Sequence, residues 1–323
     1  MMRIPEYLSF SALALFERSA TEYYIRYMHT PKLEREPQTD AMSVGSAFDA
    51  IVKNRLSSDL FGPDHTERLG LRLRDLIPKQ CSPHTLPESL EIAIPIWTQY
   101  EESGAYRALL DEVQLSAVEP QFEVRVQARI GGVEIMGYPD LYYHNRDGAL
   151  VVADFKVSGS CSRAGVSPQQ GYMICRDIHG SRTNGRTHKK FVPGFHLGEE
   201  VSEYLIESHT DYWASQLSGY AWCLGEKVGS QNFLVRIEQL AVRPGCKVKC
   251  CTYKSRVSEE FQAELLERYQ RCWSAVKSNW IFNDMNLLDS QRKASNISIS
   301  LTGGLPDLDP VPCFQSGEMI WPD

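Results

Sequence analysis

Two acidic residues and a lysine stand in two neighbouring runs that have the character of strands. Asp140 ends the run GYPD at 137–140, and the run DFK at 154–156 begins fourteen residues later. Alternate residues of a strand point to the same side, so Asp154 and Lys156 share a face. If the chain turns at 145–148, Asp140 lies roughly opposite Asp154, at about 5 Å. A register shift of one residue would instead place Asp140 on the other face.

Two carboxylates at this range repel each other unless a cation lies between them. A hard divalent ion such as Mg²⁺ takes one or two protein carboxylates together with water and phosphate. Such a site supports phosphodiester hydrolysis, in which the ion polarises the phosphate and the lysine orients water or stabilises charge. The alternative is a solvated surface ion pair. The apolar run VVADFKVSG favours a buried strand, in which a charge needs a reason.

Several motifs together resemble a known family. GYPD, ADFK and QLSGY at 216–220 follow SFSALALFERSATEYY and GSAFDAIV, in an order that resembles the PD-(D/E)XK nuclease superfamily. The resemblance is to its RecB-type and phage exonuclease branch, which also includes CRISPR-associated adaptation nucleases. It implies that Asp140 and Asp154 are metal ligands, with the Phe155 carbonyl as a further ligand, and that Lys156 is the catalytic lysine.

The resemblance also gives a role to a pair of residues on a predicted helix. Gln216 and Tyr220 are four residues apart and therefore share a helix face. In the family this pair lies beside the site, where it contacts DNA or orders the catalytic groups. The alternative is a helix that packs its apolar residues inward and leaves Gln216 in solvent.

The run GSAFDAIV departs from the family pattern. RecB-type relatives carry a histidine where this chain has Asp49, whereas other branches use an acidic residue there. Asp49 is therefore expected to be an additional metal ligand, since carboxylates suit Mg²⁺ or Mn²⁺. The alternative is a surface ion pair between Asp49 and Lys53, four residues further on. Gly45 is expected to let this helix approach the sheet closely.

Two glutamates precede the strand pair. Glu119 and Glu123 are expected to lie on one strand and to share a face. A glutamate in this region adds to the acidic cluster in several relatives, so Glu119 is included as a weaker candidate ligand. A solvent-facing strand edge explains the pair equally well.

A basic segment follows the catalytic strand. RDIHGSRTNGRTHKK, at 176–190, carries five basic side chains against one acidic side chain. Arg182, Arg186, Lys189 and Lys190 are the candidate DNA contacts, because a basic loop can follow phosphates with little sequence preference. The alternative is a solvated surface insertion.

The predicted elements bring these residues together. We expect a helix over 9–28 capped by Ser9 or Ser11, a second over 40–56, an irregular helical insertion over 57–112, and a meander of antiparallel strands from 117. A basic insertion covers 159–208. After it we expect a helix over 211–225, strands in FLVRIEQLAV and KVKCCTYKSRV, and a long helix beginning at SEEF.

The order of these elements predicts an α/β fold, with a mixed central β-sheet flanked by helices. Residues 1–282 are expected to form a single nuclease domain, with 283–323 as an extended tail.

Composition limits the class of protein. The 323 residues carry 34 Lys and Arg against 41 Asp and Glu, a net charge of −7, so nucleic-acid contacts must be local. The nine cysteines lack the spacing of a closed metal site, so free thiols are expected, and no iron–sulfur cluster. There is no run long enough to span a bilayer and no good signal peptide. We expect a cytoplasmic protein, in a bacterium or a phage-infected host.

These observations predict a Mg²⁺- or Mn²⁺-dependent deoxyribonuclease, an exonuclease of the phage or recombination type. The alternative is a catalytically silent nuclease-fold protein that serves as a nucleic-acid-binding or scaffold subunit. The substrate is single- or double-stranded DNA, and the family makes a strand-annealing protein or a helicase the expected partner. Cleavage polarity, DNA against RNA, and oligomeric state are not encoded in any motif identified above.

Overall fold

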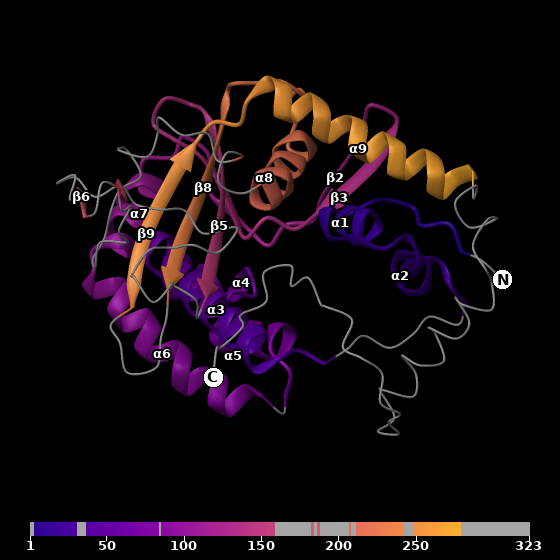
Figure 1. Ribbon diagram of the computed structural model, residues 1–323. Helices are drawn as coiled ribbons and strands as arrows, with labels where there is room; N and C mark the ends of the chain where they lie inside the picture. The colour runs from indigo at the N-terminus through magenta and orange to yellow at the C-terminus, as the bar shows by residue number, and fades with distance from the viewer. Residues whose placement is uncertain are drawn as a thin grey trace.

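The computed structural model describes residues 3–30, 37–83, 85–158, 182–183, 186–187, 207, 211–241 and 248–278. Figure 1 shows the arrangement of the elements. The helices are α1 (Phe10–Arg18), α2 (Ala20–Tyr23), the π-helix η1 (Tyr24–Met28), α3 (Asp40–Phe61), α4 (Pro63–Arg68), α5 (Leu73–Gln80), α6 (Leu86–Glu102), α7 (Ala105–Gln114), α8 (Asp211–Cys223) and α9 (Glu259–Ser278). The strands are β1 (Gln121–Phe122), β2 (Val126–Ile130), β3 (Val133–Gly137), β4 (Leu141–His144), β5 (Leu150–Ser158), β6 (Arg182–Thr183), β7 (Arg186–Thr187), β8 (Phe233–Ala241) and β9 (Lys249–Ser255).

The central sheet is mixed, as predicted. Its five strands run in the order β1-β4-β5-β8-β9, and β5 pairs with β8 in parallel while the other neighbours are antiparallel. The long segment between β5 and β8 supplies the crossover that a parallel pair requires. Helices cover the sheet on both sides (Figure 1), so the predicted α/β fold is confirmed.

The strand β5 is buried on both faces, which explains its nearly continuous apolar sequence. Val151, Ala153 and Phe155 point to the side covered by α3, α6 and α7. Leu150 and Val152 point to the opposite side, where they pack with α8. A polar side chain at the end of β5 is therefore placed between two cores and not in open solvent.

Serine side chains cap the first turns of the N-terminal helices. The Ser9 hydroxyl accepts a hydrogen bond from the Ala12 N–H at 3.2 Å, as the predicted cap requires. The expected single helix over 9–28 is interrupted at Ser19, which has an extended backbone and accepts a hydrogen bond from the Glu22 N–H at 3.2 Å. The helices on either side of this break pack with β3 and α9 in a third core cluster.

The expected meander is wrong in its pairing. The strands β2 and β3 form a two-stranded sheet of their own, and β4 pairs with β1 and β5. Gly131 and Gly132 join β2 to β3 with φ of 55° and 88°. Two central residues with positive φ make the tight turn that matches the twist of a hairpin.

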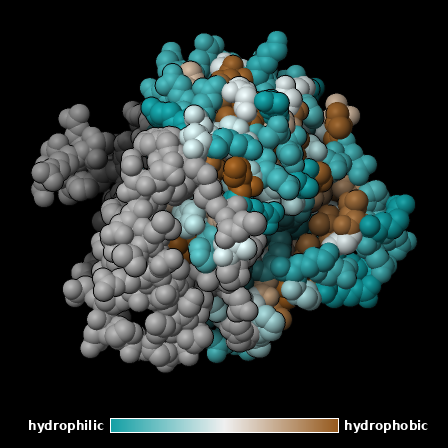
Figure 2. Space-filling view, turned by 90° about the vertical axis from the view of Figure 1, so that its right-hand side faces the viewer, coloured by the Kyte–Doolittle hydropathy of each residue, from teal (hydrophilic) through white to brown (hydrophobic). Residues whose placement is uncertain are grey.

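The helices α4 to α7 fill the segment 57–112 that was expected to be an irregular insertion. The helices α5 to α7 share one hydrophobic core with α3 and β5, and α4 packs against α3, so this segment contributes directly to the main body of the molecule. None of the helices in the described ranges is both long and apolar enough to cross a bilayer. On the face shown in Figure 2, hydrophilic residues surround smaller hydrophobic groups.

The cysteines in the described ranges agree with the expected free thiols. Cys81, Cys250 and Cys272 are buried and Cys223 is partly buried, and all four are unpaired. Most of the basic insertion and the whole tail 283–323 lie outside the described residues.

Candidate metal centre

Strand register brings the first three candidate residues together. Leu141 pairs with Ala153, so Asp140, one residue earlier, stands opposite Asp154 as expected. Asp140 Oδ2 accepts a hydrogen bond from the Phe155 N–H at 3.2 Å. The Lys156 Nζ lies 2.5 Å from Asp154 Oδ2, which confirms that these two side chains share a face.

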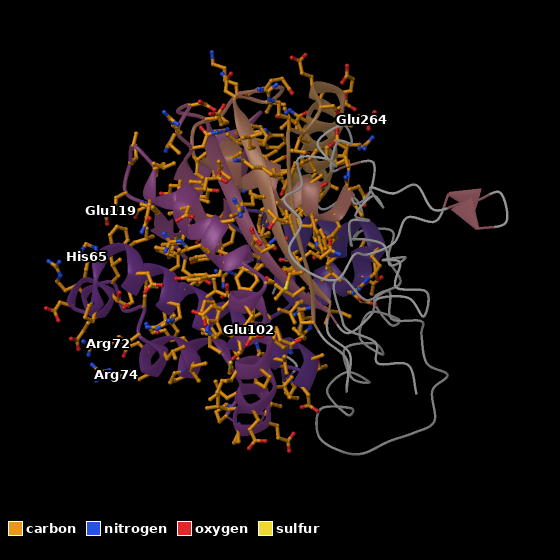
Figure 3. All side chains as sticks on the ribbon, turned by 90° about the vertical axis from the view of Figure 1, so that its left-hand side faces the viewer. His65, Arg72, Arg74, Glu102, Glu119 and Glu264 are labelled. Atoms are coloured by element: carbon orange, nitrogen blue, oxygen red, sulfur yellow. The ribbon has the colours of Figure 1, made fainter. Side chains whose placement is uncertain are left out.

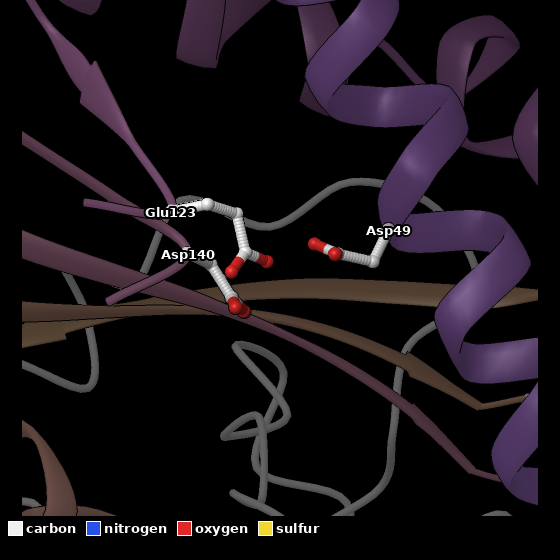
Figure 4. Close-up of side chains that lie close together, drawn as sticks. All are labelled: Asp49, Glu123 and Asp140. Atoms are coloured by element: carbon white, nitrogen blue, oxygen red, sulfur yellow. The ribbon is translucent and has the colours of Figure 1, made fainter. Parts of the chain in front are cut away.

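A second set of carboxylates meets Asp140 from other elements (Figure 4). Asp49 comes from α3, Glu123 follows β1, and one oxygen from each of these two and from Asp140 lies within 4.8 Å of the others. The hairpin register pairs Val126 with Gly137, and extending it by three residues places Glu123 opposite Asp140. Glu123 has a φ of 52°, a left-handed conformation that non-glycine residues rarely adopt away from functional sites.

The prediction for the two glutamates is wrong in its geometry, because neither lies on a strand. Glu119 precedes β1 and lies on the surface near His65 (Figure 3), with its Oε1 3.4 Å from the His65 Nε2. Glu123 follows β1 and turns into the cluster. The left-handed backbone at Glu123 breaks the period-two alternation that would have given both residues one face.

Lys53 also belongs to the centre, although the sequence alone did not predict this. Its side chain is fully buried, and its Nζ donates to Asp49 Oδ2 and to Glu123 Oε1 and lies 3.4 Å from Asp140 Oδ1. The Gln80 amide donates to the same two acceptors, at 3.2 Å to Asp49 and 3.1 Å to Glu123. The expected alternative, a surface pair between Asp49 and Lys53, is wrong: the pair exists, but inside the acidic cluster.

Burial and charge move the acidic groups in different directions. Burial, with the charges of Asp140 and Glu123, raises the pKa of Asp49 to about 8 against the opposing effect of Lys53. Burial, with the Asp140 charge, likewise raises the pKa of Asp154 to about 7 against Lys156. Burial would also raise the pKa of Asp140, but Lys53, Lys156 and the Phe155 N–H outweigh it and lower that pKa.

Both lysines keep their charge. Burial lowers the pKa of each ammonium group, but the surrounding carboxylates outweigh burial and raise both pKa values above the ordinary lysine value. Lys53 and Lys156 are therefore hydrogen-bond donors in this centre, and neither is a base at neutral pH.

A buried oxygen makes the centre fit a divalent cation. Asp49 Oδ1 is buried and receives no hydrogen bond, whereas the buried Asp154 Oδ2 is ion-paired with the Lys156 Nζ at 2.5 Å. A buried carboxylate oxygen without a donor is favourable only beside a cation. The N–H and C=O of one strand residue point to the same edge, so the Phe155 carbonyl faces the side of β5 that holds Asp140. Oxygen donors of this kind suit Mg²⁺ or Mn²⁺.

The helix α8 contacts the centre from the face of the sheet that carries Asp154 and Lys156. The Gln216 amide donates to the Tyr220 hydroxyl at 3.0 Å, so the two residues act as a pair. Tyr220 lies against Gly137 of the GYPD run so closely that a Cβ on Gly137 would be 2.1 Å from the ring. Gly45, in contrast, has nothing within 4 Å of its Cβ position, and the expected close approach of α3 at that residue is wrong.

The remaining candidates lie in the basic insertion. Arg182 and Arg186 belong to the short antiparallel pair β6–β7. Lys189 and Lys190 lie outside the described residues. The structure therefore brings Asp49, Asp140, Asp154 and Lys156 into one centre and leaves the basic candidates as predictions.

A sequence profile of the PD-(D/E)XK nuclease superfamily matches residues 7–170, about half of the chain. The chain belongs to the PD-(D/E)XK nuclease superfamily. The matched range contains the acidic centre and Lys156, and divalent metals are the cofactors of these nucleases.

No curated protein matches the chain. Among solved structures, it is similar to a candidate exonuclease from Eubacterium rectale, at 14% identity and a TM-score of 0.45, over 85% of this chain and 82% of that one. It is also similar to the protein SSO0001, at 12% identity and a TM-score of 0.24, over 81% of this chain and 84% of that one.

Proposed function

We propose that this nuclease is a metal-dependent deoxyribonuclease of the RecB-type and phage exonuclease branch. The observation that carries the proposal is the convergence of the Asp49, Glu123 and Asp140 carboxylates, with the Asp49 Oδ1 buried and free of hydrogen bonds. Buried acids without donors are costly in a protein that does not bind a cation. A catalytically silent scaffold would gain nothing from keeping them.

The residues have distinct roles in this proposal. Asp140 and Asp154 hold Mg²⁺ or Mn²⁺, together with Asp49 and the Phe155 carbonyl. When bound, a divalent ion polarises the scissile phosphate and promotes attack by water. Lys156 stays protonated, so it orients the attacking water and stabilises the charge that develops on the phosphate by donating hydrogen bonds.

Substrate contacts come from both sides of the centre. Gln216 and Tyr220 line it from α8, and the basic insertion with Arg182, Arg186, Lys189 and Lys190 follows the DNA backbone. Among the described residues, Tyr138 is 47% exposed and lies two positions before Asp140, where its ring is available to stack on a base.

Finer parts of the proposal come from the family resemblance. They are exonucleolytic action on single- or double-stranded DNA, a role in phage-type recombination in the cytoplasm, and a strand-annealing protein or helicase as partner. The nuclease domain spans residues 1–282, with an insertion over 159–208.

The test is cleavage of end-labelled linear DNA and of circular DNA, single- and double-stranded, with Mg²⁺, Mn²⁺ or EDTA. We expect metal-dependent degradation of linear DNA that Asp154→Asn and Lys156→Ala abolish while folding and DNA binding persist. Asp111→Asn and Lys277→Ala are matched controls, because both residues lie on outer helix surfaces. Cleavage of circles at equal rate would contradict exonuclease action, and binding without any cleavage would favour the scaffold function.

A further inference from the structure

We propose that Lys53 is a built-in cation of the metal centre, so that the centre loads a single divalent ion. The inference rests on the proposed metal dependence and specifies how many ions the centre takes. Lys53 belongs to α3, one helical turn after Asp49, and it is fully buried. No motif of the sequence gives it a role.

Lys53 fills the space that the carboxylates of Asp49, Glu123 and Asp140 enclose. An ammonium group has three hydrogens and no acceptor. The Lys53 Nζ contacts two of these carboxylates directly and lies 3.4 Å from an oxygen of Asp140. Since one oxygen from each acid lies within 4.8 Å of the others, an ammonium among them leaves no room for a metal ion in the same position.

The oxygens that Lys53 does not contact define where an ion can bind. Asp49 directs Oδ2 to Lys53 and Gln80, while its Oδ1 stays buried and without a hydrogen bond. Asp154 is beyond the contacts of Lys53, and its Oδ2 is ion-paired with Lys156 at 2.5 Å. The cation position beside Asp49 Oδ1 is therefore open, and the position bounded by Glu123 is closed.

The formal charges of the centre also support a single divalent ion. The centre contains four carboxylates, on Asp49, Glu123, Asp140 and Asp154, and two ammonium groups, on Lys53 and Lys156. Two negative charges remain when all six groups are ionised, and one divalent ion neutralises them. A second divalent ion would place excess positive charge in a largely buried site, which is unfavourable.

Lys53 is thus a positioning residue. It holds Asp49 and Glu123 from the side away from the open position and fixes which oxygen of Asp49 is left for a ligand. Replacing Lys53 with an apolar side chain of similar length vacates a position bounded by three carboxylates, which is a second site for a hard cation.

The experiment is a measurement of Mn²⁺ stoichiometry by isothermal titration calorimetry, with electron paramagnetic resonance to count bound ions, on the full chain without nucleic acid. We expect one ion per chain for the wild type and two for Lys53→Met. The double variant Lys53→Met/Glu123→Gln should return to one ion, because the new site loses a ligand charge. Glu119→Gln in the Lys53→Met background is the matched control and should keep two.

The outcomes separate this inference from the proposed function. Two ions on the wild-type chain, or one ion on folded Lys53→Met, would overturn the role of Lys53 and leave metal dependence intact. No bound ion on the wild type would overturn both. If circular dichroism shows that Lys53→Met does not fold, Lys53→Gln replaces it with the same expectation of two ions, and the wild-type count remains decisive.

Discussion

Replacing Gly137 with alanine tests whether the GYPD run packs in close contact with helix α8 at the candidate metal centre. A Cβ on Gly137 would lie 2.1, 2.6 and 3.2 Å from three carbons of the Tyr220 ring. Ordinary contacts between carbons begin near 3.4 Å, so the ring must retreat by about 1.3 Å at its nearest atom. Tyr220 is held by the hydrogen bond from Gln216, and a displacement of this size strains that bond.

We expect Gly137→Ala to lower the free energy of unfolding by about 1–3 kcal/mol, the usual cost of overpacking. Gly45→Ala is the matched control, since Gly45 lies within helix α3 and its Cβ position has nothing within 4 Å. Alanine there should raise the free energy of unfolding by about 0.5–1 kcal/mol, because glycine is the weaker helix former. The same substitution should therefore change stability in opposite directions at the two glycines.

The assay is urea denaturation of a double-mutant cycle that combines Gly137→Ala with Tyr220→Ala. In the Tyr220→Ala background the ring is absent, so Gly137→Ala should cost less than about 0.5 kcal/mol, the usual limit for a substitution that disturbs nothing. An equal loss of stability in both backgrounds would refute the close contact and assign the effect to the backbone of Gly137.

Three further predictions follow from charge. In EDTA the free energy of unfolding should fall from pH 5 to 8, because Asp49 and Asp154 keep protons in the native state that the unfolded chain has released near pH 4. Mg²⁺ should reduce the dependence of this free energy on pH. A melting temperature that rises with pH would contradict this prediction. Glu238→Ala should lower the free energy of unfolding by about 3–5 kcal/mol in urea titrations, since it leaves the buried Arg236 without its buried partner. A decrease below about 1 kcal/mol would show that stability does not depend on this pair. Reversing the charge of Lys189 and Lys190 should weaken DNA binding and flatten its salt dependence, and an unchanged slope would make the segment an ordinary solvated surface.

The part of the centre that sequence predicts is the part fixed by local geometry. The turn at 145–148 and the alternation of β5 determine the register that places Asp140 opposite Asp154, and both can be read over fewer than twenty residues. The hydrogen bond from the Asn145 N–H to the Ala149 carbonyl, with the Asn145 side chain accepting from two backbone N–H groups, closes this turn. A motif that depends on one hairpin needs no knowledge of the rest of the fold.

The choice of glutamate required more than local pattern. Period-two alternation gives Glu119 and Glu123 the same face only if the chain is extended between them. The strand β1 covers just two residues, and the backbone at Glu123 then turns into the left-handed region. Since no glycine or asparagine marks this turn, its position depends on the separate β2–β3 hairpin, which tertiary packing sets.

Lys53 was missed for a different reason. A lysine four residues after an aspartate in a helix is usually part of a solvated ion pair, and this assumption needs a helix with one exposed face. The helix α3 is instead buried around most of its circumference, because α5, α6 and β5 contact it from different directions. The burial of Lys53 is therefore a property of the assembled core, and Glu123, its partner from 70 residues away, is absent from any local window.

Asp140 connects the two halves of the centre. Its Oδ1 faces Lys53 from α3 at 3.4 Å, and its Oδ2 accepts the Phe155 N–H from β5 at 3.2 Å. These donors, together with Lys156, explain why the pKa of Asp140 is lowered while those of the neighbouring Asp49 and Asp154 are raised. In the proposed metal centre, Asp140 would bind an ion without releasing a proton, whereas Asp49 and Asp154 would have to release theirs. The Asp140 carboxylate thus joins the contributions of helix α3 and of the central sheet in one site. The position of Asp140 depends on the pairing of β4 with β5.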